Sequence, residues 1–411
     1  MLTQKAVDII KSTAPIIEIH GEALARNFYE RLFTYNPEMI SFFNSSNQIN
    51  GTQQKALANA ICAYAANIDN LDVLQSSVER IANKHTSLQI KPEHYHIIGE
   101  NLLASISDVL GESAKENILN AWKEAYDFLA KILIKREEQI YNENQKKSGG
   151  WRGFKSFTIS RKEKESDIIT SFYLLANDGN PLPDFSPGQY ITIRITAPDG
   201  QKTMRNYSLS DKPNQHWLRI SVKKEINRDN NTIGYVSHML HENIDIGSKL
   251  EVAPPCGDFF LNTKLNSVRP LVLLAGGVGI TPILSMLKSV LDSTSKRDVT
   301  LIYGCLNEKV QAFKKTINQM VDKHSNLKVY YRYSENCDFD KKEKSSTGYV
   351  DSDFMYSSIK NQNSDYYICG PKPFMINVYH TLMFWDIDYS QIHIEFFGPR
   401  SELKNFIKPF S

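Results

Sequence analysis

The stretch 141–154, YNENQKKSGGWRGF, divides the chain into two parts with different sequence patterns. It passes from polar residues through a glycine pair to aromatic residues, which is how a helix ends and a new domain begins. Before it, apolar residues recur at every third or fourth position, whereas after it apolar and polar residues alternate between turns that contain glycine and proline. We therefore predict a helical part and a strand-rich part, with the boundary near Ser148.

The length of the chain predicts more than one hydrophobic core. At about 150 residues per domain, 411 residues favour two or three domains, and we expect three, at residues 1–147, 148–265 and 266–411. The composition, 41% hydrophobic and 23% charged, is that of an ordinary globular protein. A formal net charge of +2, with scattered basic residues, gives no reason to expect nucleic acid or an anionic membrane as a partner.

The sequence favours a cytoplasmic location. No apolar run reaches the roughly 18 residues of a transmembrane helix, and the start, MLTQKAVDIIKSTAP, lacks the apolar core of a signal peptide. The five cysteines are odd in number and form no C-x-x-C pair, which argues against a disulfide framework or a structural zinc site. Reduced thiols are typical of a cytoplasmic protein. We also expect the protein to be a monomer.

The first part, residues 4–141, is predicted to contain six or more helices. The predicted boundaries between these helices are at Pro15, Asn36-Pro37, Asn50-Gly51 and Lys91-Pro92. His85 lies on an apolar helix face, so it is predicted to point inward. A lone inward histidine is more often a core residue than a metal ligand, and the pattern by itself leaves both readings open.

Two further residues bear on His85. A histidine that binds iron needs a hydrogen-bond acceptor on its other ring nitrogen, and a carboxylate there pushes electron density toward the metal. Tyr95 and Glu137 are candidates for this support. On their own, Glu137 would be interpreted as part of a solvated helix face and Tyr95 as a packing aromatic.

The second part begins with a predicted antiparallel barrel that extends to about Leu261. The segment MRNYSLS places Arg205, Asn206, Tyr207 and Ser208 at the end of a strand. A flavin needs a cation for its diphosphate, a flat ring beside the isoalloxazine and a donor near the nitrogen that accepts hydride. Supporting signals are GQY, which contains Tyr190, and GYVSHML, in which Gly234 and Ser237 open a short helix whose N–H groups can bind phosphate. A barrel with ordinary turns is the alternative.

Residues 269–395 alternate strands and helices, which predicts a doubly wound parallel sheet. The first loop, AGGVGITP, follows an apolar strand and opens a helix, as a pyrophosphate-binding loop does. We expect Thr281 at the N-cap and Pro282 at the first helical position. The candidate dinucleotide-binding residues of this loop are Gly277, Val278, Gly279, Ile280, Thr281 and Pro282.

Two further segments lie at carboxyl ends of strands in this sheet, where ligands of open sheets bind. They are Cys369-Gly370 and the run Phe396, Phe397, Gly398 and Pro399. In isolation, each would be read as a buried cysteine or a strand-end aromatic. The second strand ends in YGCLNEK, with Glu308 and no arginine, and a carboxylate repels the 2′-phosphate of NADPH. This favours NADH over NADPH.

The whole chain resembles the bacterial flavohaemoglobins. NFYERLFTYNPE, FFNSSNQINGTQQKAL, IANKHTSLQIKPEHY and REEQIYNEN match motifs of their globin domain in order, and RNYS and GGVGITP match those of the ferredoxin-reductase-like module. The resemblance implies an all-α globin, an antiparallel β-barrel FAD domain and an α/β NAD(P)-binding domain. It implies one haem b per chain, FAD, and NADH or NADPH as cofactors.

The resemblance also implies roles for single residues. His85 would be the proximal haem ligand, Tyr95 and Glu137 the hydrogen-bonded relay behind it, and Phe43 a porphyrin contact. The distal residues would be Tyr29, Gln53 and Leu57. Cys369 and Gly370 would border the nicotinamide, and Phe397 would cover the flavin until the nicotinamide displaces it.

The distal residues also have a physical interpretation. Bound dioxygen carries partial superoxide character, so a phenol O–H from Tyr29 and an amide N–H from Gln53 would stabilise it. The alternative reading leaves the Tyr29 hydroxyl in water and makes Gln53 an exposed residue of a first helical turn.

The implied activity is that of a nitric oxide dioxygenase, in which nitric oxide and dioxygen become nitrate and electrons pass from NAD(P)H through FAD to haem. One NAD(P)H would serve two nitric oxide molecules in this detoxification reaction. Two alternatives stay open: a globin that binds or senses gas, and a reductase whose acceptors are quinones, dyes or hydroperoxides. The charged insert 338–346 and the tail after Arg400 carry no functional reading.

Overall fold

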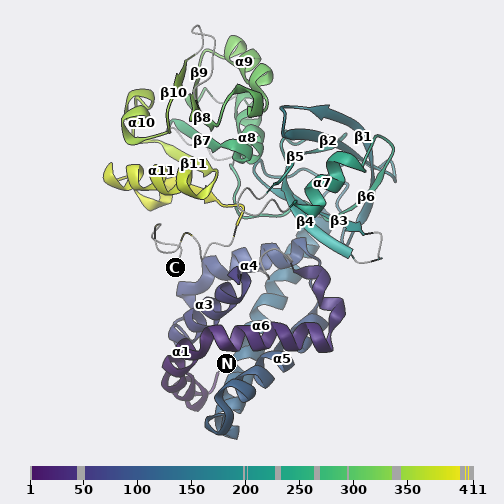
Figure 1. The fold of residues 1–411 in the computed structure, drawn as a ribbon, viewed down its shortest axis with the longest axis vertical. Helices are drawn as coiled ribbons and strands as arrows, with labels where there is room; N and C mark the ends of the chain where they lie inside the picture. Colours follow the sequence, from purple (N-terminus) through teal and green to yellow (C-terminus); the bar gives the residue numbers. More distant parts are fainter. Residues whose placement is uncertain are drawn as a thin grey trace.

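The computed structural model describes residues 2–43, 51–197, 200, 202–226, 233–262, 269–293, 296–335, 344–398, 403 and 406. Figure 1 shows a helical domain, an antiparallel sheet domain and a parallel sheet domain, in that order along the chain. The predicted fold class is therefore confirmed. In the described part of the chain, no helix is both long enough and apolar enough to cross a membrane.

The helical domain forms because the apolar positions of its helices fall on one face each and pack together. Its α-helices are α1 (Gln4–Tyr35), α3 (Thr52–Ala66), α4 (Gln75–Ser87), α5 (Pro92–Leu110) and α6 (Glu116–Lys146). Short 3₁₀ helices, η1 (Pro37–Phe42), η2 (Leu71–Leu74) and η3 (Gly111–Ser113), connect them. The main core includes Leu24, Phe28, Leu32 and Ile106, and a smaller cluster beside it contains Tyr95.

Helix α1 continues through Pro15, although the sequence predicts a helix boundary at this proline. Proline removes one backbone donor from a helix and normally kinks or ends it. Here the hydroxyls of Ser12 and Thr13 donate to the Ile9 carbonyl at 2.9 and 2.8 Å in the preceding turn. Ile10 and Ile17 are buried on either side, so core packing holds both halves of the helix. The predicted ends at Asn36-Pro37 and Lys91-Pro92 do coincide with helix boundaries.

The antiparallel sheet has the strand order β4-β3-β6-β1-β2-β5. Its strands are β1 (Lys155–Lys164), β2 (Ile169–Ala176), β3 (Tyr190–Thr196), β4 (Lys202–Ser208), β5 (Leu218–Lys223) and β6 (Lys249–Val252), and one helix, α7 (Tyr235–Glu242), accompanies them. A bridge between Leu209 and Ile220 joins the two edges, so the sheet closes into a barrel. Phe157, Phe172 and Ile191 are fully buried inside it.

The parallel sheet has the order β10-β9-β8-β7-β11-β12. Its strands are β7 (Leu271–Gly276), β8 (Val299–Cys305), β9 (Leu327–Tyr333), β10 (Ser345–Thr347), β11 (Asp365–Cys369) and β12 (Ile392–Glu395). Its helices are η4 (Gly277–Gly279), α8 (Ile280–Asp292), η5 (Glu308–Val310), α9 (Lys314–Lys323), α10 (Ser352–Ser358), α11 (Lys372–Phe384) and η6 (Tyr389–Gln391). Alternate residues of β7 face opposite sides, Leu273 toward α8 and α9 and Leu274 toward α10 and α11. The sheet is therefore covered on both faces, as a doubly wound fold requires.

The predicted capping positions at the start of α8 differ from the structure. The helix after the glycine loop begins at Ile280 with Gly279 at the N-cap, so neither Thr281 nor Pro282 has its predicted capping position. The loop tightens into η4, and the Thr281 hydroxyl donates back to the Val278 carbonyl at 3.0 Å. In addition, part of the charged insert forms β10, a short edge strand parallel to β9.

Candidate functional site

His85 sits near the end of α4 with its Nδ1 between two side chains from other helices. Nδ1 lies 2.9 Å from the Tyr95 hydroxyl on α5 and 2.8 Å from Glu137 Oε1 on α6. The Tyr95 hydroxyl also donates to Glu137 Oε1. The Glu137 side chain is 4% exposed, whereas that of His85 is 32% exposed. The three predicted residues are thus brought together around one ring nitrogen.

This arrangement selects one histidine tautomer. An ionised carboxylate only accepts hydrogen bonds, so it favours the proton on Nδ1 and leaves the lone pair on Nε2. Nε2, which Tyr95 and Glu137 do not contact, is then the electron-pair donor of the ring. A neutral imidazole with a carboxylate behind it is the donor that a haem iron takes, so these residues fit the group implied by the sequence.

Helix α6 also fixes the backbone around this cluster. The Tyr126 hydroxyl donates to the Tyr95 carbonyl at 2.6 Å, and the Tyr141 hydroxyl donates to the Ile90 carbonyl at 2.7 Å. Burial, followed by the charge of Glu137, raises the pKa of Tyr95, so its hydroxyl stays a donor at neutral pH. The sequence did not single out Tyr126 or Tyr141, because each looks like an ordinary helix aromatic.

Of the predicted distal residues, Tyr29 is part of the main core of the helical domain. Tyr29 is 6% exposed on α1, and its ring contacts that of Phe43 in an edge-to-face arrangement at 5.5 Å. Burial raises the pKa of Tyr29, and a hydrogen bond with the Gln53 side chain acts in the opposite direction. Leu57 packs against the same core. The Tyr29 side chain is therefore buried, whereas the alternative reading placed its hydroxyl in water.

The predicted flavin motif lies on β4, and its side chains point to both faces of the sheet. Arg205 and Tyr207 are two positions apart, so they share one side of the strand, while Ser208 pairs with Tyr190 on the other side. Burial lowers the pKa of Arg205 and raises that of Tyr207. A bound anion would favour the charged guanidinium, so this position fits a diphosphate. Asn206 accepts a hydrogen bond from Thr192 Oγ1 at 2.8 Å within the sheet.

The turn before α7 uses the Ser237 hydroxyl internally. This hydroxyl donates to the Gly234 carbonyl at 2.8 Å and accepts from the Glu225 backbone N–H at 3.1 Å. A Cβ at Gly234 would lie 2.8 Å from Ser237 Oγ, so only glycine fits there. The backbone N–H groups at the start of α7, rather than the Ser237 hydroxyl, are the groups that can reach a phosphate.

The glycine loop after β7 is closed on one side and open on the other. A Cβ at Gly279 would lie 2.2 Å from the Cys369 carbonyl oxygen, which makes this close approach possible only for glycine. Gly277 has φ +54°, and a Cβ there would meet nothing within 4 Å. Open space beside a left-handed glycine at a helix start fits the close approach of a pyrophosphate.

The two strand ends present backbone and one aromatic ring. Cys369 is fully buried, so Gly370 provides the accessible part of its strand end. A Cβ at Gly398 would lie 2.6 Å from the Phe396 ring, whereas Phe397 is 51% exposed. Phe397 is thus the ring that is available to a ligand. Pro399 lies outside the described residues.

Helix α4 also contacts the other two domains. Asn83 Oδ1 accepts from the Gly257 backbone N–H at 3.3 Å, and Thr86 Oγ1 lies 3.7 Å from Cys256 Sγ. Lys84 is attracted to Glu395 at the end of β12, although burial lowers its pKa overall. Sequence reasoning missed these contacts because they join segments far apart in the chain, which leave no periodic signal.

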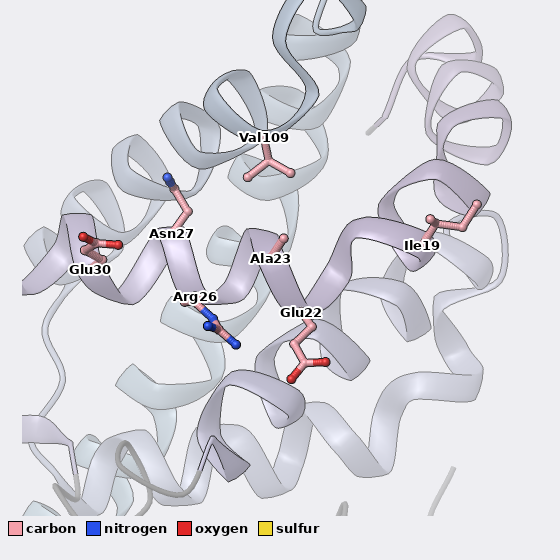
Figure 2. Close-up of a pocket in the computed structure, with 7 residues that line it drawn as sticks. All are labelled: Ile19, Glu22, Ala23, Arg26, Asn27, Glu30 and Val109. Atoms are coloured by element: carbon pink, nitrogen blue, oxygen red, sulfur yellow. The ribbon is translucent and has the colours of Figure 1, made fainter.

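A separate groove of about 590 Å³ lies along α1 next to α5 (Figure 2). Its lining residues are Ile19, Glu22, Ala23, Arg26, Asn27, Glu30 and Val109. None of the predicted site residues is among them.

Comparisons with known proteins agree with these three regions. The family models Globin, Oxidoreductase FAD-binding domain and Oxidoreductase NAD-binding domain match residues 26–133, 156–261 and 273–380. A Flavohemoprotein of Halalkalibacterium halodurans is 42% identical over 98% of both chains. Another, from Rhodopirellula baltica, is 44% identical over 98% of this chain and 99% of its own.

The chain belongs to the flavohaemoprotein family.

Solved structures support the same assignment. The flavohemoglobin from Malassezia yamatoensis with bound FAD and heme has a TM-score of 0.84 at 25% identity, and the match covers 97% of this chain and 100% of that one. The FAD/NAD-binding domain of nitric oxide dioxygenase from Vibrio cholerae has a TM-score of 0.54 at 32% identity and matches 60% of this chain and 100% of its own. The expected cofactors of this flavohaemoprotein, haem, FAD and a nicotinamide nucleotide, are confirmed by its domains and relatives.

Proposed function

We propose that this flavohaemoprotein is a cytoplasmic, monomeric nitric oxide dioxygenase that removes nitric oxide. The reaction consumes two nitric oxide, two dioxygen and one NAD(P)H, and yields two nitrate, one NAD(P)⁺ and one proton. The single observation that carries the proposal is the buried Glu137 and Tyr95 pair on Nδ1 of His85. A reversible gas carrier does not need such strong electron donation behind its histidine, whereas oxygen chemistry benefits from it.

The residues on this chain divide the work. When bound, haem supplies the redox iron for oxygen chemistry, and FAD converts a hydride into single electrons. His85 Nε2 would hold the iron, and Glu137 and Tyr95 keep the proton on Nδ1. Tyr29 and Gln53 would orient the gas through hydrogen bonds, next to the Phe43 ring that contacts Tyr29. The name of the Vibrio cholerae relative supports this assignment.

In the reductase half, Arg205 would bind the flavin diphosphate, and Tyr190, Asn206, Tyr207 and Ser208 would surround its ring and ribityl chain. Gly234 and Ser237 would shape the phosphate turn, and residues 277–282 would bind the nicotinamide nucleotide. Phe397 would cover the flavin between turnovers. We propose boundaries at residues 147/148 and 265/266, which fall outside the matched family regions.

We also propose that NADH is preferred over NADPH. Glu308 follows β8, and Glu335 follows β9. Lys314 forms an ion pair with Glu308. Asn307 Nδ2 donates a hydrogen bond to Glu335 Oε2 at 2.6 Å. Carboxylates at these strand ends would accept from ribose hydroxyls and repel a 2′-phosphate.

The test is nitric oxide consumption by the purified protein loaded with haem and FAD, with NADH and air. We expect nitrate and NADH consumption in a two-to-one ratio. His85→Ala should abolish nitric oxide consumption while NADH-driven ferricyanide reduction continues, because those electrons leave from FAD. Slow nitric oxide loss beside normal haem reduction would favour a gas sensor. Unchanged nitric oxide consumption in His85→Ala would contradict the assignment of the site.

A further inference from the structure

A buried ion pair joins the barrel domain to the parallel sheet domain. Lys288 Nζ on α8 donates to Asp211 Oδ1 at 2.6 Å, and the two side chains are 19% and 12% exposed. The Trp217 indole N–H donates to the other carboxylate oxygen at 3.3 Å. The carboxylate is therefore held from both sides, which an isolated surface pair is not.

A second hydrogen bond from α8 fixes the backbone at the same point. The Ser285 hydroxyl donates to the Asp211 carbonyl at 2.7 Å, and Ser285 is fully buried. Ser285 and Lys288 are three positions apart, so they lie on one face of the helix. Both the side chain and the backbone of Asp211 are thus bound by a single turn of α8.

The position of this contact in the chain links the two proposed cofactor sites. Asp211 is three residues after Ser208, the last residue of the flavin motif on β4. Ser285 is four residues after Thr281, in the helix that the glycine loop opens. Because both connections are short, a shift at Asp211 moves the flavin strand relative to the dinucleotide helix.

We propose that Asp211 and Lys288 are positioning residues that set the distance between flavin and nicotinamide for hydride transfer. This inference rests on the cofactor sites of the proposed function. The hydride leaves the nicotinamide ring with its electron pair, giving NAD⁺, and enters the flavin, which is reduced. Such a transfer needs the reacting atoms about 3–3.5 Å apart, and a displacement near 1 Å can cost about 100-fold in rate.

The chain offers a matched control at the same interface. Lys212 and Asp292 form an ion pair at 2.6 Å between the same two segments, but their side chains are 41% and 63% exposed. Solvent screens such a pair, so its loss changes little. Removing Lys288 instead takes away the cation that is hydrogen-bonded to the Asp211 carboxylate and leaves only the attraction of Arg219 to balance its charge.

The experiment measures flavin reduction by NADH in stopped flow, with the full chain loaded with haem and FAD. Lys288→Met should lower the limiting rate about 10- to 100-fold at saturating NADH, with little change in the NADH dissociation constant or FAD content. Lys212→Met should keep the wild-type rate. In the protein without cofactors, Lys288→Met should also speed hydrogen exchange in α8.

A conservative variant separates positioning from general damage. Lys288→Arg keeps a cation beside the Asp211 carboxylate and should recover about tenfold in limiting rate over Lys288→Met. A wild-type rate in Lys288→Met, or equal losses in Lys288→Met and Lys288→Arg, would overturn the proposal. If NADH does not reduce the flavin of the wild-type protein, the proposed function is wrong. The hydrogen exchange of α8 then tests the ion pair by itself, and unchanged exchange in Lys288→Met would contradict its role.

Discussion

Glu137 and Glu138 are neighbours on α6 with different surroundings. Glu137 is buried and binds Nδ1 of His85, whereas Glu138 pairs with Arg152 at 2.6 Å with its side chain 48% exposed. The pKa of Glu138 is lowered, first by its hydrogen bond from Arg152. Only the first carboxylate can therefore act on the histidine.

We predict the effect of replacing each of these two carboxylates by an amide of the same shape. Glu137→Gln should reduce the turnover number for nitric oxide about 10- to 100-fold, because the amide keeps a hydrogen bond to the histidine but loses the negative charge. Glu138→Gln is the control and should stay within about twofold of wild type, since exposed pairs contribute little. Steady-state nitric oxide consumption measures both, and equal effects would remove the special role of Glu137.

The roles of single residues follow from the sequence only in part. Helical spacing places His85 on an inward face, but a partner 52 positions away, such as Glu137, has no fixed position relative to it until the helices pack. The resemblance supplied that partner. Tyr126 could not be predicted, because a hydroxyl that bonds to a backbone carbonyl leaves no sequence pattern. The assigned catalytic roles remain predictions.

At the scale of elements, α6 binds α5 through Tyr126, α4 through Glu137, and the connection between α4 and α5 through Tyr141. Gly99 on α5 allows this packing, since a Cβ there would lie 2.6 Å from the Tyr126 ring. Burial, followed by Asp127 and Glu137, raises the pKa of Tyr126. The start of α8 shows a limit of element prediction, because a glycine loop can tighten into a 3₁₀ turn and advance the helix by two residues.

The raised pKa gives a stability prediction with a defined sign. A tyrosine in the unfolded chain loses its proton near pH 10, whereas folded Tyr126 retains it. Its contribution to stability is thus complete below pH 10 and is lost as the pH rises from there. We expect Tyr126→Phe to destabilise the helical domain by about 1 kcal/mol at pH 8. It should also lose less stability between pH 8 and 10.5 than wild type does.

Urea unfolding followed by the haem absorbance would measure this at both pH values. The control is Tyr35→Phe, which removes a hydroxyl from a side chain that is 67% exposed on α1 and should leave the stability unchanged. Equal alkaline losses in wild type and Tyr126→Phe would contradict the prediction.

At the scale of the whole molecule, three domains meet around α4. The fold of each domain follows from its own periodicity, as the confirmed fold class shows, but the contacts between domains do not. Asn83 illustrates this: its Nδ2 donates to the Glu79 carbonyl at 2.9 Å in its own helix, while its Oδ1 accepts from Gly257 in the barrel domain. A polar residue on a helix surface would otherwise be read as solvated.

This contact predicts an effect on electron transfer between the helical domain and the barrel domain. Asn83→Ala removes the hydrogen bond to Gly257, worth about 1 kcal/mol, from the docking of α4 against residues 256–257, so haem reduction by reduced flavin should slow by up to about fivefold. It also removes the bonds from Asn83 Nδ2 to Glu79 within the helical domain. Asn142→Ala, which loses only an exposed bond to Glu138, should match wild type. Stopped-flow mixing with NADH resolves the flavin and haem phases. A slowed flavin phase would place the defect elsewhere, whereas a slowed haem phase alone would show that this contact brings the proximal helix to the flavin domain.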